Sequence, residues 1–329
     1  MNSFISSSEP SAKSAAGIGF ILTFCLSLLL AIPVVWAFLI VIDPFDTGRL
    51  TPLKRTGMFY AGPRKANASR MRDPSFDAAI FGNSTSQLIN PQRMNALTGQ
   101  NFVQLTVPGT GPMEQRAMIE QLFRVRGDGI KTLILGFGAL WCDPPRQTST
   151  LHPFPFWLYT DNTVDYLRGL FRMDSIHSVP RRIQALRKKQ RMADRDGFSD
   201  YELTSIYDET TIPVVPELPI SKTGVHSARD SLAAVLVIIP PQTRVILLHP
   251  PAFTPANIHL SARGLETKRL CKSELADVAA KRPHTVVVDR WVEDVFTRNR
   301  SLFYDYNHYR TDFAKVIELD LSRHLNDMK

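Results

Sequence analysis

An uncharged apolar run near the N-terminus constrains this sequence more than any other feature. From Ala16 to Ile42 the chain reads AGIGFILTFCLSLLLAIPVVWAFLIVI. At a rise of 1.5 Å per residue, a helix of this length can cross a bilayer. The run is longer than the apolar region of a signal peptide, and no small-residue cleavage site follows it. We therefore expect residues 16–42 to form an uncleaved transmembrane signal anchor behind a cytoplasmic tail, residues 1–15.

Charged residues beside the anchor favour a cytoplasmic position for the rest of the chain. Lys13 and Glu9 precede the anchor, while Arg49, Lys54 and Arg55 follow it. Positive residues concentrate on the cytoplasmic side of membrane helices, although large domains translocate largely regardless of flanking charge. If the domain lies outside instead, we expect the three following basic residues to form a short collar against the lipid headgroups.

The residues beyond the anchor are sufficient for one large domain. The chain has 329 residues, of which 44% are hydrophobic and 21% charged, a composition typical of globular proteins. Residues 43–75 are rich in Pro, Gly and basic residues, and they predict a juxtamembrane linker that packs loosely or wraps the domain. Residues 76–329 are expected to form the domain itself.

Apolar runs alternate with helical patterns along this domain. Expected strands cover residues 76–81, 101–107, 131–136, 244–249 and 285–289, and expected helices cover residues 112–126, 228–239, 262–281 and 309–325. This alternation predicts an α/β fold, with a mostly parallel sheet in a three-layer α/β/α arrangement. Right-handed crossovers place the carboxyl ends of the strands at one edge, where ligands bind in folds of this class.

Residues 143–225 interrupt the alternation. They are rich in proline and aromatic residues, with a helical pattern near residues 164–171 and a basic segment, Arg181–Arg195. We expect an insertion that lies over the edge of the sheet or over the site. The basic segment indicates either a solvated helix face or a patch for anionic lipid headgroups or an acidic polymer. Nucleic acid is not an expected partner, because no binding motif accompanies these residues.

Residues suited to catalysis follow the first two predicted strands. Ser84, in Gly82-Asn-Ser-Thr85, comes where the first strand meets a helix, so its hydroxyl and backbone N–H face a helix N-terminus that stabilises negative charge. An ordinary helix N-cap has the same pattern. Gly109, in Val107-Pro-Gly-Thr-Gly111, follows the second strand, where glycine lets backbone N–H groups approach a substrate oxygen. A plain turn also accounts for these glycines.

A third pattern precedes the last predicted helix. In Asp305-Tyr-Asn-His308 the aspartate can hold one ring nitrogen of the histidine, which leaves the other nitrogen free to take a proton from a serine. A surface turn with a satisfied histidine has the same spacing. The three patterns together predict a triad in which Ser84 is the nucleophile, His308 the base and Asp305 the residue that orients it.

The order of these patterns resembles the SGNH/GDSL hydrolase superfamily over residues 77–325, apart from the insertion. Ser84 falls on the family's block-one serine, Gly109 on its block-two glycine, and Asp305 and His308 on its block-five pair. The resemblance implies esterase or acyltransferase chemistry, with the backbone N–H groups of Ser84 and Gly109 as an oxyanion hole. No cofactor or metal is expected.

The overall layout is also similar to the membrane-anchored branch of this superfamily. Members of that branch O-acetylate bacterial exopolysaccharides or serve in D-alanylation of cell-wall polymers. The resemblance implies a serine esterase or O-acyltransferase in the bacterial cytoplasmic membrane, with a periplasmic domain and an acylated glycan or envelope polymer as substrate. The periplasmic position implied by the resemblance conflicts with the cytoplasmic position that the charges beside the anchor favour. Of the two orientations we expect the periplasmic one.

The sequence departs from the family at two positions. Asn83 stands where the family has aspartate, and no asparagine follows the third strand in Gly136-Phe-Gly-Ala-Leu-Trp-Cys142, where the family has an oxyanion donor. Trp141 and Asn307 are alternative donors, and Ser86 is an alternative nucleophile. The missing asparagine favours a second function, that of a non-catalytic binding or assembly protein of the cell envelope.

The remaining reactive side chains carry less information. His249 follows the fourth strand and is expected to be a packed or loop histidine. Cys25 lies in the anchor, and no Cys/His spacing typical of a metal site occurs. Cys142 and Cys271 could form a disulfide in an oxidising compartment or remain two buried thiols, and the sequence leaves both open.

Overall fold

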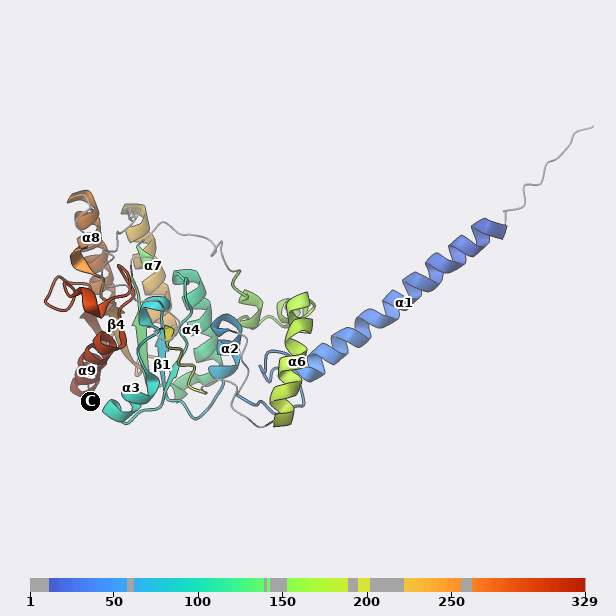
Figure 1. Ribbon diagram of the computed structural model, residues 1–329, viewed down its shortest axis with the longest axis horizontal. Coiled ribbons are helices and arrows are strands. Elements are labelled where there is room, and N and C mark those ends of the chain that lie inside the picture. The colour runs from blue at the N-terminus through green and yellow to red at the C-terminus, as the bar shows by residue number, and fades with distance from the viewer. Residues whose placement is uncertain are drawn as a thin grey trace, which may run out of the picture.

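A long apolar helix and a folded domain make up the structure (Figure 1), a computed structural model that describes residues 12–57, 62–138, 141–142, 153–188, 195–201, 222–255 and 262–328. The helix, α1 (Ala12–Ile42), extends away from the domain. Its residues Gly17–Ile42 are long and apolar enough to cross a membrane, and they are almost entirely exposed. The predicted anchor is therefore present as a helix of suitable length and composition.

Five parallel strands form the sheet of the domain. They are β1 (Ala78–Phe81), β2 (Phe102–Gln104), β3 (Thr132–Gly136), β4 (Arg244–His249) and β5 (Thr285–Asp289). Their order across the sheet is β2-β1-β3-β4-β5, and every neighbouring pair is parallel. Each predicted strand is confirmed, although β1 and β2 are shorter than predicted.

A separate apolar core covers each face of the sheet, because successive side chains of a strand point to opposite faces. One core joins strand residues such as Ala79 and Leu133 to three helices, α4 (Pro112–Arg126), α7 (Lys222–Ile238) and α8 (Ala262–Ala279). The other core joins Ala78 and Ile134 to α3 (Pro91–Thr98) and α9 (Thr311–Asp327). Short 3-10 helices in the connections are η1 (Ser84–Ser86), η2 (Gly127–Gly129), η4 (Phe156–Leu158) and η7 (Arg300–Leu302).

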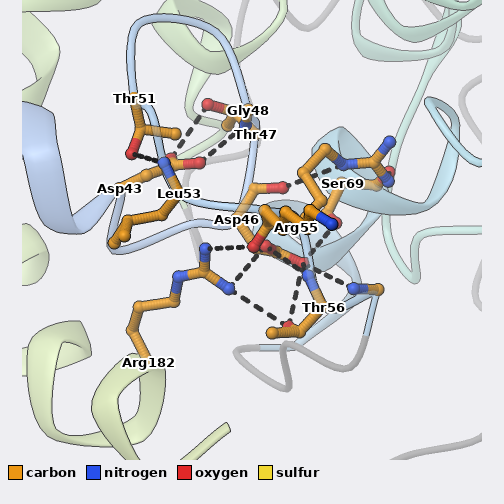
Figure 2. A network of polar contacts seen from close by, with 12 residues as sticks. Asp43, Asp46, Thr47, Gly48, Thr51, Leu53, Arg55, Thr56, Ser69 and Arg182 are labelled. Atoms are coloured by element: carbon orange, nitrogen blue, oxygen red, sulfur yellow. Dashed lines mark hydrogen bonds and ion pairs between the residues drawn. The ribbon is translucent and has the colours of Figure 1, made fainter. Parts of the chain in front are cut away.

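The described part of the segment between α1 and the sheet packs closely against the domain, in agreement with the second of the two arrangements that the sequence left open, a linker that wraps the domain. The fully buried carboxylate of Asp46 accepts hydrogen bonds from the backbone N–H groups of Thr56 and Gly57, at 2.9 and 2.7 Å. It also pairs with buried Arg182 at 2.5 Å and accepts from the Ser69 hydroxyl at 3.1 Å (Figure 2). A buried charge is tolerated only with such partners.

Two residues of the expected basic collar bind the protein instead of facing outward. Arg55 donates to the carbonyl oxygens of Ser69 and Arg72, at 2.5 and 2.8 Å. Arg49 donates to the carbonyl oxygen of Thr160 at 2.7 Å, and its guanidinium lies over the Tyr166 ring. The Arg55 side chain thus holds α2 (Pro63–Arg70), and the Arg49 side chain holds the start of α5 (Thr163–Leu170), while the collar itself stays a prediction.

The insertion divides into two described parts with different positions. Helices α5 and α6 (Met173–Lys188) contact the C-terminal end of α1. Residues 195–201 run beside β2, where the N–H of Gln104 donates to the carbonyl of Asp196 at 2.6 Å, and then reach the predicted site. The expected position over the edge of the sheet is thus found for residues 195–201. The basic segment is not a wholly solvated face, since Arg182 is buried, and residues 189–194 of that segment lie outside the described residues.

A disulfide resolves the choice that the sequence left open for two cysteines. Cys142 and Cys271 are bridged, with a Cα–Cα distance of 6.2 Å, and both are buried. The bridge ties the segment that follows β3 to helix α8. Cys25 is a free, exposed cysteine in α1.

Candidate active site

The candidate site lies at the carboxyl end of β1, where the strand order reverses. In the order β2-β1-β3-β4-β5, the chain moves outward from β1 to β2 and then returns to β3 on the other side of β1. Open parallel sheets bind ligands in the crevice at such a point. The turn η1 follows β1 directly and carries Ser84, which is half-buried.

Asn83 shapes the turn that presents Ser84. Its side-chain oxygen accepts hydrogen bonds from the backbone N–H and the hydroxyl of Thr85, at 3.0 and 2.7 Å. Only the oxygen of the amide is used in these two bonds, so asparagine serves as this cap in the same way as aspartate. The departure from aspartate at position 83 therefore leaves the geometry of the turn intact.

Ser86 is excluded as the nucleophile by its burial. Its side chain is fully buried between β1 and β3. A Cβ atom at Gly136 would lie 1.8 Å from the Ser86 hydroxyl oxygen, and one at Gly82 would lie 2.6 Å from it. The lack of side chains at the two glycines thus leaves the space that the Ser86 side chain occupies, and this space is closed to solvent.

The last connection of the domain carries His308 across the sheet to Ser84. This connection starts at β5, the strand at the far edge. It crosses the end of β4, where the Phe253 N–H donates to the Tyr306 carbonyl and the Thr254 N–H to the Thr297 carbonyl, each at 2.9 Å. The next helix, α9, packs against α3, which follows the Ser84 turn.

Ser84, His308 and Asp305 form a continuous hydrogen-bonded chain, as predicted. His308 Nε2 lies 2.8 Å from Ser84 Oγ, and His308 Nδ1 lies 2.7 Å from Asp305 Oδ2. The other carboxylate oxygen, Oδ1, accepts the backbone N–H groups of Asn307 and His308 at 2.9 and 2.8 Å. The predicted geometry of the triad is therefore confirmed, and the catalytic role of its members stays a prediction.

Asp305 is suited to remain ionised beside the histidine. Burial by itself raises the pKa of this carboxyl group, but hydrogen bonds from the His308 ring and from the two backbone N–H groups hold the pKa below its usual value. An ionised carboxylate fixes the tautomer of the ring, with the proton on Nδ1 and Nε2 free to accept one.

The Gly109 turn lies beside the Ser84 turn because β2 pairs with β1. The register continues past the strands, since the Val107 N–H donates to the Gly82 carbonyl at 2.9 Å. Gly109 has a φ of +73°, a conformation that favours glycine, and Arg64 donates to the preceding Pro108 carbonyl at 2.6 Å. This arrangement agrees with the predicted oxyanion donors at Ser84 and Gly109, whose role stays a prediction.

One of the two alternative oxyanion donors is excluded by the structure. The Trp141 ring N–H donates to the side-chain oxygen of Gln115 at 3.1 Å, and the whole residue is buried. Trp141 therefore has no free donor for a substrate. Asn307 lies in the turn between Asp305 and His308, and its role as a donor through the side-chain amide stays a prediction.

His249 is packed in the core, as expected. It is 2% exposed, and its ring lies edge-on to the Phe137 ring at a centroid distance of 4.3 Å. Burial lowers the pKa of the imidazole to about 4, so the ring is neutral at physiological pH. A buried neutral histidine that does not touch the triad has no evident acid–base role.

Tyr201 is a site residue that the sequence did not reveal. Its ring meets the His308 ring edge-on at a centroid distance of 5.6 Å, and its hydroxyl donates to the Tyr309 carbonyl at 2.7 Å. It thereby packs against the imidazole on the side of the insertion. No local pattern marks it, because it lies at the border of a segment with no regular periodicity.

Glu318 is a second residue that sequence reasoning missed. Its buried carboxylate accepts from Arg93 in α3 and from the backbone N–H of Asn90, at 2.5 and 2.7 Å. Asn90 ends the loop that carries Ser84, and Glu318 lies in α9, the helix that follows His308. Their contact therefore fixes the position of Ser84 relative to His308.

The described residues contain no group of three or more His, Cys, Asp or Glu side chains that could hold a metal ion. No protein-family model matches this sequence, and neither does any curated protein.

Proposed function

We propose that this protein is a membrane-anchored serine esterase or O-acyltransferase with the three-layer α/β/α fold of the SGNH hydrolases. The observation that carries the proposal is the hydrogen-bonded chain from Ser84 through His308 to Asp305. A serine hydrogen-bonded to a base, with the base oriented by a third group, is the recurring arrangement of nucleophilic acyl transfer. It sits at the crevice where a sheet of this order binds ligands.

In the proposed reaction Ser84 Oγ attacks the carbonyl carbon of an acyl ester and gives its proton to His308 Nε2. The backbone N–H groups of Ser84 and Gly109 bind the oxyanion of the tetrahedral intermediate. Collapse of this intermediate releases the alcohol, which takes the proton from His308, and leaves the acyl group on Ser84. Water or an acceptor hydroxyl then attacks the acyl-serine, with His308 again as base and Asp305 holding the ring.

The proposed substrate is an acylated glycan or envelope polymer outside the cytoplasmic membrane. This part of the proposal comes from the family resemblance, together with a helix able to anchor the chain. The Cys142–Cys271 disulfide supports a periplasmic domain, because such bridges form and persist in oxidising compartments.

A fluorophosphonate probe tests the proposal on the full-length chain. We expect covalent labelling of the wild-type protein and loss of labelling in Ser84→Ala. Ser86→Ala is the matched control: it removes a hydroxyl from the same turn, and labelling should persist because that hydroxyl is buried. Labelling that survives in Ser84→Ala would exclude this serine as the nucleophile.

A non-catalytic binding or assembly protein of the cell envelope is the second candidate. The absence of asparagine after β3 favours it, since Trp141 does not replace the missing donor. Loss of one oxyanion donor costs about 3–4 kcal/mol of transition-state stabilisation. A folded wild-type protein that the probe does not label would support this second candidate and contradict the first.

A further inference from the structure

The hairpin of α5 and α6 lies against the end of α1 that enters the domain. The Trp36 ring N–H donates to the Leu167 carbonyl at 3.2 Å, and the Trp36 ring meets the Phe171 ring edge-on at 5.7 Å. Closer to the domain, Arg182 donates to the carbonyl of Ile42 at 3.2 Å. Phe171 ends α5 and Arg182 lies in the second half of α6, so the tip of the hairpin is level with Trp36.

The position of Trp36 along α1 lies close to the edge of the bilayer that α1 would cross. The 26 residues from Gly17 to Ile42 span about 39 Å as a helix, compared with about 30 Å of hydrocarbon in a bilayer. A centred helix therefore extends about 4–5 Å beyond the hydrocarbon on each side. The rise from Trp36 to Ile42 is about 9 Å, which places Trp36 and the adjacent hairpin tip about 4–5 Å inside the edge of the hydrocarbon.

The tip presents large apolar side chains to its surroundings. Phe171, Met173 and Ile176 are 46%, 63% and 43% exposed. The opposite face of α6 carries the buried residues that hold it to the domain, among them Ser178 and Arg182. Three exposed large apolar residues thus gather in the turn and in the first part of α6, beside Trp36, and Val164 at the start of α5 is exposed as well.

Charged residues around the tip include more cations than anions. Arg168, Arg172 and Arg181 are exposed. The two nearby carboxylates have cationic partners, Asp165 with Arg168 at 3.9 Å and Asp174 with Lys65 at 3.0 Å. Exposed apolar side chains flanked by arginines suit the surface of a membrane that contains anionic lipids.

The hairpin cannot swing away from this position without breaking a buried ion pair. Arg182 binds Asp46 and also donates to the Thr56 hydroxyl at 3.1 Å and to the Lys54 carbonyl at 3.3 Å (Figure 2). The yellow-green helix α6 accordingly crosses the domain end of α1 in Figure 1. Its tip therefore keeps a fixed depth relative to α1.

We propose that the tip of the α5–α6 hairpin, Phe171 to Ile176, inserts through the headgroup region to the outer part of the hydrocarbon in the leaflet through which α1 enters the domain. Its ligand is the surface of a phospholipid bilayer with anionic headgroups. The proposal rests on the membrane-spanning role of α1 and is independent of the catalytic assignment.

Depth-dependent fluorescence quenching tests this insertion. The full-length chain, with Cys25→Ser and the disulfide intact, is reconstituted in vesicles of phosphatidylcholine and phosphatidylglycerol. An environment-sensitive fluorophore is attached to Met173→Cys, and in parallel to Ile176→Cys. Val295→Cys, at a 78% exposed site after β5, is the aqueous control, and Leu29→Cys in the middle of α1 is the control for insertion.

We expect lipids that carry a spin label near the headgroup to quench positions 173 and 176 severalfold more than position 295, and aqueous iodide to show the reverse order. Iodide quenching at position 173 equal to that at position 295 would overturn the proposal. Protection from both quenchers would also overturn it, because a protein would then cover the tip. Iodide access at position 29 would overturn the premise of the proposal, because α1 would then not span the bilayer. Fluorophosphonate labelling tests catalysis separately.

Discussion

Ser84 and Ser86 belong to one short turn, and their different directions follow from its geometry. Successive residues of a 3-10 helix are rotated by about 120°. When Ser84 faces His308, Ser86 must face elsewhere, and the space against Gly136 receives it. The sequence offers two serines of the same kind, and only the position of the turn on the sheet distinguishes the reactive one from the structural one.

The buried imidazole of His249 makes stability depend on pH. Its pKa is about 4 in the folded protein and near the ordinary value of 6.5 in the unfolded chain. Above both values the ring is neutral in both states and has no effect. As pH falls from 6.5 towards 4, the unfolded chain binds a proton that the folded protein does not, so the free energy of unfolding decreases.

We expect His249→Leu to lose this contribution. Between pH 7.5 and 4.5 the wild-type protein should lose on the order of 2 kcal/mol more stability than the variant. Urea unfolding of both proteins, followed by tryptophan fluorescence, measures the difference. Identical pH dependence in the two proteins would show that the ring already titrates normally in the fold.

Among the elements, the contact between α9 and α3 controls how the triad is assembled. Burial raises the pKa of Glu318 in spite of the hydrogen bonds from Arg93 and Asn90, so the charge of this carboxylate depends on those partners. We expect Glu318→Gln to lower the free energy of unfolding by about 1–3 kcal/mol and to slow fluorophosphonate labelling, because His308 and Ser84 lose their common register.

The matched control for this contact lies on the same helix. Lys315 is exposed and pairs with Asp312, so Lys315→Ala should change stability by less than about 0.5 kcal/mol and leave labelling unchanged. An unfolding midpoint and a labelling rate that stay at the wild-type values in Glu318→Gln would contradict a positioning role for the α9–α3 contact.

The elements that the sequence predicted are those with a local pattern. The strands are short apolar runs, buried on both faces except in the edge strand β5, and the triad residues follow strand ends or form one turn. Each could therefore be found from a few neighbouring residues. The partners that fix these elements are far apart in the chain. In the sequence, Arg182 is one of several basic residues in a run, and Asp46 is one acidic residue in the segment after the anchor. Their ion pair could not be predicted, because only the fold brings them together. The contact of Tyr201 with His308 could not be predicted for the same reason.

For the whole molecule, the side of the membrane decides which substrates the site can meet. A C-terminal fusion to alkaline phosphatase should be active, because the periplasm allows the phosphatase and the Cys142–Cys271 bridge to form their disulfides. A cytoplasmic fluorescent-protein fusion at the same position should be dark. As a control, phosphatase placed at Ala15, before the apolar run that starts at Ala16, should be inactive. The reverse pattern would put the domain in the cytoplasm and remove the proposed envelope polymer from its reach.

The packed connection around Asp46 also limits the range of positions that the candidate site can take above the membrane. A flexible tether of about 30 residues has a root-mean-square length of roughly 30 Å and lets a catalytic domain sample a wide hemisphere above the bilayer. Here the described part of the connection is folded onto the domain and clamped to α6, so helix and domain turn together as one body. Ser84 then stays at one height above the lipid, so the proposed polymer substrate would have to come within that narrow layer to reach it.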